Sequence, residues 1–542
     1  MRVLLLYPLF PTSFWSWDKI LELTGRKALL PPLGLITVGA ILPQTWDFKL
    51  VDRNVRDITD QEWDWAELVI LSGMIVQKPD LLAQISEAKH RDKFVAVGGP
   101  YATALPHEVQ AAGADYLILD EGEITLPLFV KAIKRGETSG TFRATEKPDV
   151  TSTPIPRYDL LEMDLYDTMS VQFSRGCPFQ CEFCDIIVLY GRKPRTKTPT
   201  QLIAELQALY DSGWRGTVFM VDDNFIGNKR NVKLLLKELK IWRENLGNPF
   251  SFLTEASVDL AQDEELLDLM VECDFHWVFL GIETPDESSL TLTQKHQNTR
   301  DPLSDAMATI TGYGIQIMAG FIIGFDGETA GAGKRIVQFV EQTAIPVPLF
   351  SMLQALPDTA LWHRLQKEKR LLNREGNINQ TTLMNFLPTR PIDEIAEEYV
   401  EAFSELYDPQ KYLERAFRHF MMLGAPRHPE TFKVRRGSDP DDLKQIGKQG
   451  SKHQAAVTLF WRQGVVRSTR WTFWVNLMRI YWHKRDLLEA YLTVCAYLEH
   501  FNEYRQIVRE QISTQLAQHL KHHPSCINGE PQVLEKVKLP VS

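Results

Sequence analysis

The chain has 542 residues, a formal net charge of −10, 44 % hydrophobic residues and 24 % charged residues. This composition is typical of a globular protein with room for roughly two to four domains. No apolar run reaches the roughly 18–20 residues of a membrane span, and the acidic balance argues against a general nucleic-acid binder. The opening MRVLLLYPLF is interrupted by proline too early for a signal peptide. We therefore expect a buried first strand and a cytoplasmic protein.

The six cysteines are unevenly spaced. Cys177, Cys181 and Cys184 fall within eight residues, and the other three are isolated. A protein held together by disulfides would use more cysteines in a shorter chain. The crowding predicts a metal site in a reducing compartment, and we expect Cys273 and Cys495 to be buried thiols.

The first 140 residues alternate short apolar runs with amphipathic stretches of helical length. The predicted strands are residues 3–7, 48–52, 68–72, 94–98 and 116–119. Strands that alternate with helices predict a parallel α/β sheet of Rossmann-like type, whose ligands lie at the carboxyl ends of the strands. The composition changes from residue 136 onward, and its prolines, threonines and serines predict a linker at 141–165.

A second α/β domain is predicted at residues 166–362. Its expected strands are residues 169–174, 217–221, 251–256, 277–282, 316–323 and 349–354. Six βα units predict a partial (β/α)6 barrel rather than a complete eight-stranded one. Strand signals fade beyond it, and helical periodicity predicts an α-helical region at 363–542.

The crowded cysteines lie in the loop SRGCPFQCEFC, which follows the first strand of the second domain. The spacing is C-x3-C-x2-C. A zinc site normally takes four protein ligands, whereas three thiolates on a [4Fe–4S] cluster leave one iron open for a small molecule. Cys177, Cys181 and Cys184 are therefore the predicted cluster ligands, and a structural zinc ion is the alternative.

With the aromatic Phe183 before its last cysteine, this loop resembles the signature of the radical S-adenosylmethionine (SAM) superfamily. The resemblance implies that the open iron holds SAM, and that its reductive cleavage yields a radical that abstracts hydrogen from an unactivated carbon. It also implies that Phe183 and residues at the following strand ends lie near SAM; the latter are Asp222, Asp223, Asn224, Glu255, Glu283 and Gly324. Helix caps, solvated charges and turn glycines would produce the same pattern.

The first domain resembles the cobalamin-binding domain found in one class of these enzymes. In place of the D-x-H-x-x-G motif the chain has Asp52 and then Asn54, where the histidine would stand. Ser72 and the pair Gly98–Gly99 match further positions of that domain. The resemblance implies cobalamin as a cofactor near these residues, with no protein imidazole on cobalt. A domain used only for packing is the alternative.

Residues 353–361 (LQALPDTAL) and 385–389 (NFLPT) resemble the helical extension of a branch that includes the hopanoid C-2 methylases. The resemblance implies an enzyme that methylates an unactivated carbon of a hydrophobic small molecule and that receives electrons from a donor such as ferredoxin or flavodoxin. A cobalamin-dependent cyclase or rearrangement enzyme, and a non-catalytic sensor of the cluster and cobalamin, are the alternatives.

Residues 433–485 form a basic segment with twelve Lys or Arg and three Asp or Glu, a local charge of +9. Tryptophan, tyrosine and phenylalanine are interleaved with these cations. Such a segment either packs on the protein core or lies at a membrane surface, and nucleic-acid binding is the weakest alternative. The protein is thus expected to be cytoplasmic, and the membrane alternative would make it peripheral to a membrane.

Overall fold

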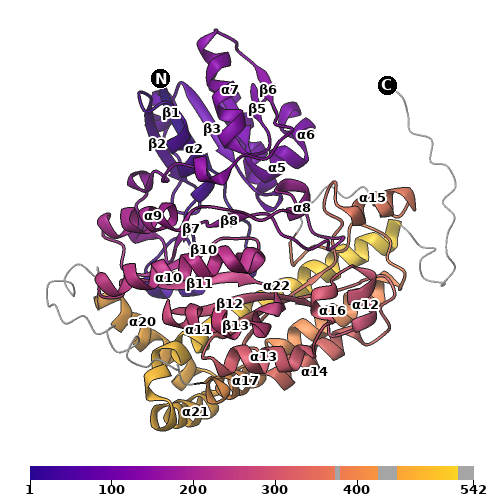
Figure 1. The fold of residues 1–542 in the computed structure, drawn as a ribbon. Helices are drawn as coiled ribbons and strands as arrows, with labels where there is room; N and C mark the ends of the chain where they lie inside the picture. Colours follow the sequence, from indigo (N-terminus) through magenta and orange to yellow (C-terminus); the bar gives the residue numbers. More distant parts are fainter. Residues whose placement is uncertain (373–378, 425–448, 523–542) are drawn as a thin grey trace.

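The computed structural model describes residues 1–372, 379–424 and 449–522. Two parallel sheets lie one above the other, and the C-terminal helices run beneath and beside the lower sheet (Figure 1). Cys526 and residues 433–448 of the basic segment lie outside the described residues. Among the described residues, no helix is long and apolar enough to cross a membrane.

The upper sheet has the strand order β2-β1-β3-β4-β5-β6, and every pairing in it is parallel. This confirms the predicted Rossmann-like sheet. Its apolar strands are covered by helices, so the core is buried on both faces. The strands are β1 (Arg2–Tyr7), β2 (Asp47–Asp52), β3 (Leu68–Ser72), β4 (Phe94–Gly98), β5 (Tyr116–Ile118) and β6 (Gly140–Phe142). The helices are α1 (Asp18–Thr24), α2 (Leu33–Ile41), α3 (Asp60–Trp65), α4 (Lys78–His90), α5 (Gly99–Ala104), α6 (Pro106–Ala111) and α7 (Gly122–Lys134).

Strand β6 was not predicted, because it has only three residues and begins with glycine. It pairs with β5, with Tyr116 opposite Gly140. The first sheet therefore extends into the segment predicted as a linker.

The lower sheet has the order β14-β13-β12-β11-β10-β7 and is also fully parallel. This confirms the predicted six-stranded partial barrel. Its strands are β7 (Met169–Val171), β10 (Thr217–Met220), β11 (Ser251–Ala256), β12 (Phe275–Glu283), β13 (Gln316–Ile323) and β14 (Val347–Met352). Its helices are α8 (Ile186–Leu189), α9 (Pro199–Asp211), α10 (Lys229–Asn245), α11 (Glu264–Glu272), α12 (Glu287–Leu292), α13 (Leu303–Gly312) and α14 (Ala332–Thr343).

Helices dominate the chain beyond the barrel, as predicted. Cys495 lies in the last of them and is buried, as is Cys273 after α11, which confirms both expectations. The helices are α15 (Ala360–Lys367), α16 (Ile392–Leu406), α17 (Pro409–Met422), α20 (Gln449–Trp461), the π-helix η8 (Arg462–Val466), α21 (Arg470–His483) and α22 (Leu488–His522).

The loop between β1 and α2 connects the N-terminal domain to the C-terminal helices. Trp17 packs against Tyr497 of α22, with ring centroids 4.1 Å apart, and Phe14 packs against Phe501 at 4.8 Å. Between them, Trp15 reaches the barrel and lies 5.7 Å from the ring of Phe279 on β12. The loop thereby forms one wall of the space between the two sheets.

Candidate active site

The cysteine loop leaves the lower sheet at the carboxyl end of its first strand. Cys181 is buried, and Cys177 and Cys184 are half-buried. Two amides point at the sulfurs: Asn224 Nδ2 lies 3.8 Å from Cys177 Sγ, and Gln297 Nε2 lies 3.7 Å from Cys181 Sγ. Donors aimed at sulfur favour thiolates and tune a bound cluster.

The described residues contain no group of three or more His, Cys, Asp or Glu side chains placed to hold one metal ion. A cubane does not require such a group, because each of its thiolates binds a different iron. Burial raises the pKa of Cys177 and of Cys184, so binding of a cluster has to displace their protons.

Asp222 supports the cysteine loop instead of facing a ligand. Its buried carboxylate accepts hydrogen bonds from the backbone N–H groups of Phe173 and Ser174, both at 2.7 Å, and from Ser174 Oγ at 2.6 Å. These bonds divert the chain from the sheet. The predicted strand 169–174 therefore ends at Val171, and Ser174–Arg175 (β8) pairs instead with Arg195–Thr196 (β9). The expectation that Asp222 contacts SAM is not supported by this geometry.

Arg175, two residues before the first cluster cysteine, ties the loop to the N-terminal domain. Its guanidinium lies 2.8 Å from Glu121 and 2.8 Å from Glu123, at the start of α7. Arg195 of the neighbouring strand also pairs with Glu121, at 2.8 Å. All four side chains are largely shielded from water, so they position the loop rigidly against the upper sheet.

A second anchor comes from the C-terminal region. Arg364 of α15 donates two hydrogen bonds to Glu182, which lies between the second and third cysteines, at 2.8 and 3.2 Å. It also bonds to Asp326 at 2.7 Å, and Asp326 in turn accepts from Arg370 at 2.6 Å. The cysteine loop is thus held from both sides. No local sequence signal identifies Arg364, because 182 residues separate it from its partner.

A cavity of about 3150 Å³ joins the two sheets. Its upper part lies beyond the carboxyl ends of the first sheet, and its lower part extends into the barrel, where ligands of parallel sheets bind. The predicted residues that line it are Asn54, Ser72, Gly98, Gly99, Asp223 and Glu255. Arg175, just before the cysteines, and residues from 185 to 190, just after them, also line the cavity, so it extends to both flanks of the cysteine loop.

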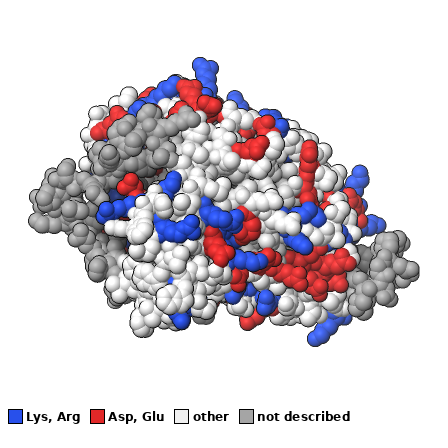
Figure 2. All heavy atoms as spheres, turned by 90° about the horizontal axis from the view of Figure 1, so that it is seen from below, with Lys and Arg blue, Asp and Glu red and all other residues white. Residues whose placement is uncertain are grey.

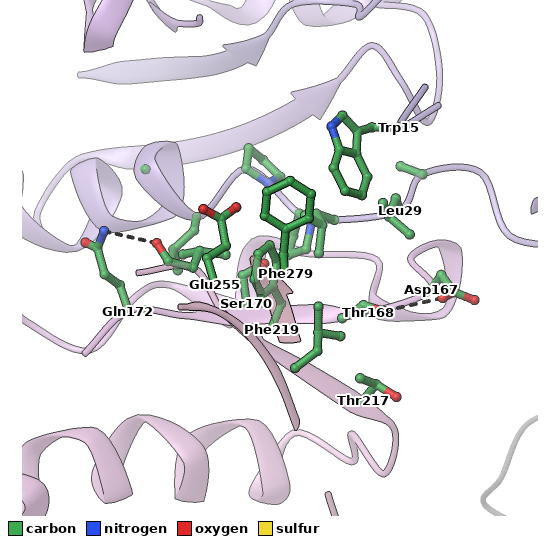
Figure 3. Close-up of a pocket in the computed structure, with 18 of the residues that line it drawn as sticks. Trp15, Leu29, Asp167, Thr168, Ser170, Gln172, Thr217, Phe219, Glu255 and Phe279 are labelled. Atoms are coloured by element: carbon green, nitrogen blue, oxygen red, sulfur yellow. Dashed lines mark hydrogen bonds between the residues drawn. The ribbon is translucent and has the colours of Figure 1, made fainter. Parts of the chain in front are cut away.

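Inside the barrel the wall of the cavity changes from polar to apolar and back. Figure 3 shows Glu255 and Gln172 on one side and Thr217 and Thr168 on the other, with the rings of Phe219 and Phe279 between them. Trp15 and Leu29 close the apolar stretch from above. The barrel wall therefore has an apolar stretch between two polar ends.

Two carboxyl groups at the cofactor end have raised pKa values. Burial and the neighbouring Asp223 and Asp222 raise the pKa of Glu255 to about 8. Burial also raises the pKa of Asp223 to about 6, although its hydrogen bond from Gly176 N opposes this. Acidic groups forced together in this way favour a cationic ligand, because a positive charge would relieve their repulsion.

Glu283 and Gly324 do not line the cavity. Glu283 forms a buried ion pair with Lys295, whose ammonium lies 5.9 Å from the centre of the Phe183 ring. Gly324 has φ of 100°, and a Cβ there would lie 2.7 Å from Cε of Met384. Its lack of a side chain therefore permits packing of the C-terminal region, and nothing in this geometry supports contact with adenine.

The upper end of the cavity is shaped by Ser72, Gly98 and Gly99. A Cβ on Gly99 would lie 2.4 Å from Ser72 Oγ, and one on Gly98 would lie 2.8 Å from a backbone carbonyl oxygen. Asn54 joins the loop after β2 to the loop after β1: it accepts from Phe10 N at 2.8 Å and donates to Asp52 at 2.7 Å. Asp52 is buried and does not line the cavity, and its carboxylate also accepts from Tyr166 Oη at 3.1 Å.

Residues 171–340 match the Radical SAM superfamily, and residues 359–514 match a domain of unknown function, DUF4070. The chain is 66 % identical to the uncharacterized methyltransferase sll1242 of Synechocystis sp., over 96 % of this chain and 95 % of that protein. It is 38 % identical to the hopanoid C-2 methylase of Rhodopseudomonas palustris, over 79 % of this chain and 81 % of that protein.

Two solved structures share most of the fold. The cobalamin-dependent SAM radical enzyme OxsB superposes with a TM-score of 0.57 at 16 % identity, covering 96 % of this chain and 81 % of its own. The radical SAM methyltransferase TsrM from Kitasatospora setae superposes with a TM-score of 0.57 at 15 % identity, covering 80 % of this chain and 98 % of its own. At this identity the likeness shows a shared fold. The chain is therefore an enzyme of the radical SAM superfamily, with a [4Fe–4S] cluster and SAM as cofactors, and it belongs to the family of methyltransferases that includes the hopanoid C-2 methylase.

Proposed function

We propose that this enzyme binds cobalamin and transfers a methyl group to an unactivated carbon of a hydrophobic small molecule. The observation that carries the proposal is the single cavity that runs from the strand ends of the Rossmann-like sheet, past the flanks of the cysteine loop, into an apolar barrel. A substrate in the barrel would face both cofactor sites at once. The hopanoid C-2 methylase at 38 % identity supports a hydrophobic acceptor.

Each cofactor has candidate residues in this arrangement. Cys177, Cys181 and Cys184 would hold the cluster, and Asp223 and Glu255 would face the cationic parts of SAM. The cobalamin residues would be Ser72, Gly98, Gly99 and the Asn54 loop, at the upper end of the cavity. When bound, the cluster with SAM supplies radical chemistry, and cobalamin supplies a transferable methyl group.

The remaining residues orient the substrate and exclude water. Trp15, Phe219 and Phe279 offer broad apolar surfaces that would hold a polycyclic body against the barrel wall. Thr217 and Thr168 would accept or donate a hydrogen bond at the far end. A fixed substrate would hold the reacting carbon close to the cofactors, which lowers the entropic part of the barrier. We further propose that a small reduced carrier such as ferredoxin or flavodoxin supplies the electron.

The proposal for cobalamin can be tested by its spectrum. Among the described residues at the upper end of the cavity there is no histidine. The Co(II) form bound to the protein should therefore show no hyperfine coupling to a protein imidazole nitrogen. Coupling that changes when the protein is labelled with ¹⁵N-histidine would contradict the expected mode of binding.

Methyl transfer can be tested in cells. A strain that lacks the gene should be compared with strains complemented by the wild type and by the Cys177→Ala, Cys181→Ala, Cys184→Ala triple variant, after growth on methionine labelled in its methyl group. We expect a lipid-soluble compound that carries the label only in the wild type, together with its unmethylated precursor in the other strains. If the compound that is missing from the deletion strain instead differs from its precursor by ring closure, and the two carry the same amount of label, the enzyme is a cyclase.

A further inference from the structure

Helix α21 is apolar on two opposite faces. Its inner face carries Phe473, Leu477 and Ile480, which are buried where the helix packs against α17 and α22. Its outer face carries Trp471 and Trp482, which are 71 % and 75 % exposed. A helix that is apolar all round is normally enclosed by protein or lies against lipid, so the outer face requires an explanation.

The exposed apolar surface continues onto the preceding elements. Trp461 at the end of α20 is 61 % exposed, and Val466 in the π-helix η8 is 62 % exposed. We call this surface the aromatic face; its exposed residues are Val457, Trp461, Val465, Val466, Trp471, Trp474, Val475, Met478, Tyr481 and Trp482. Soluble proteins rarely leave so many large apolar side chains together in water.

The part of the chain that forms the aromatic face carries cations, and the nearest described anion in its surface hollow is Glu414 of α17. Residues 455–485 contain no Asp or Glu, and Arg470, Arg479 and Arg485 are exposed among them. Arg470 lies over the ring of Trp471 at 6.0 Å, and Arg485 lies over the ring of Tyr481 at 5.1 Å. Figure 2 views the molecule from below: its lower left is largely white with blue residues at the edge, and red gathers toward the right. Cations beside exposed tryptophans match the interface of an anionic bilayer.

The aromatic face also adjoins the substrate cavity. The cavity is lined at its far end by Tyr481 and by the turn at residues 483–488, which joins α21 to α22. Tyr481 belongs to both surfaces. A bilayer held against the aromatic face would therefore lie next to this end of the cavity.

We propose that the aromatic face docks the enzyme on an anionic lipid bilayer, so that a membrane-resident substrate enters the barrel beside the turn 483–488. The identity of the substrate rests on the proposed function, whereas docking does not. Apolar rings would enter the interface, and the arginines would pair with lipid phosphates, which explains why both kinds of residue share one face.

Flotation of the full-length protein with vesicles tests the docking without SAM or substrate. The vesicles contain two parts phosphatidylcholine to one part phosphatidylglycerol, or phosphatidylcholine alone. We expect binding to the anionic vesicles that weakens with salt. The double variant Trp471→Ser, Trp482→Ser should lower the partition coefficient about tenfold or more, and Arg470→Glu, Arg479→Glu about tenfold or more. Matched controls are Ile241→Ser, exposed on α10, and Lys334→Glu, exposed on α14, and neither should change binding.

Absence of binding to anionic vesicles at low salt would overturn the proposal, and so would binding that the control variants reduce equally. Light scattering adds an independent check. A dimer that dissociates when Trp471 and Trp482 are changed to serine would show that the face joins two copies of the chain, and would also overturn it. Docking with no methylated product would instead retain this proposal and contradict the proposed function.

Discussion

Arg175 and Glu123 form an ion pair, with 2.8 Å between guanidinium and carboxylate, that fixes the start of the cluster loop to the N-terminal domain. Burial by itself would raise the pKa of Glu123, but the charge of Arg175 holds this pKa below its ordinary value. The pair therefore stabilises the fold above the ordinary pKa of a glutamate, and this contribution is lost as the pH falls through the lowered value.

Replacement of Arg175 by methionine should leave two shielded carboxylates, those of Glu121 and Glu123, without this partner. We expect the free energy of unfolding to fall by about 3–5 kcal/mol at neutral pH, measured by urea denaturation. Arg135→Met is the matched control, because its pair with Glu137 is exposed and contributes about 0–1 kcal/mol. Equal losses in the two variants would show that the interdomain pair has no special role.

The contact between Arg364 and Glu182 should govern how firmly the cluster is held. Arg364→Met removes the two hydrogen bonds that orient the segment between the second and third cysteines. We expect an iron chelator to remove the reconstituted cluster from this variant about tenfold faster than from the wild type. Lys367→Met, on the same helix, is the control. An unchanged rate for Arg364→Met would mean that α15 does not support the cluster loop.

Gly99 should be less replaceable than another glycine with a similar backbone. Its φ is 85°, and a Cβ would collide with Ser72 Oγ. Gly136 has φ of 81° with no atom within 4 Å of the same position. Gly136→Ala should thus cost about 1 kcal/mol of unfolding free energy, from strain alone, and Gly99→Ala about 2–4 kcal/mol. Gly99→Ala should also lower the cobalamin content of reconstituted protein. Equal losses of unfolding free energy in the two variants would show that the turn at Gly99 is not sterically tight.

Glu255 should make the stability of the cofactor-free protein depend on pH. Its pKa is raised to about 8, so the folded state keeps a proton that the unfolded chain releases. Stability should therefore decrease as the pH rises from about 4.5 to about 8. Glu255→Gln should reduce this decrease and be more stable than the wild type by about 1–3 kcal/mol near pH 8, after allowance for water in the cavity. Glu397→Gln, exposed on α16, should leave the pH profile unchanged. If the stability of Glu255→Gln changed with pH in the same way as that of the wild type, the raised pKa of Glu255 would be contradicted.

The sequence predicted what depends on local pattern. Both parallel sheets follow from the alternation of apolar runs with helices, and the cysteine loop follows from spacing. Asp222 and Asp223 are adjacent carboxylates after the same strand, and nothing local shows that the first turns back to Ser174 while the second lines the cavity. The partnership of Arg364 with Glu182 depends on tertiary structure alone. Periodicity also marks α21 as a helix without showing that only one of its two apolar faces is buried.

A radical enzyme with this cavity is expected to transfer a methyl group. Once the metabolite comparison has identified the acceptor, turnover of the reconstituted enzyme gives the most direct test. In such a reaction SAM serves twice: one molecule leaves as 5′-deoxyadenosine, and another gives up its methyl group and leaves as S-adenosylhomocysteine. We predict that S-adenosylhomocysteine and methylated product form in a ratio close to unity, with at least as much 5′-deoxyadenosine. Product that accumulates with 5′-deoxyadenosine but without S-adenosylhomocysteine would contradict methyl transfer.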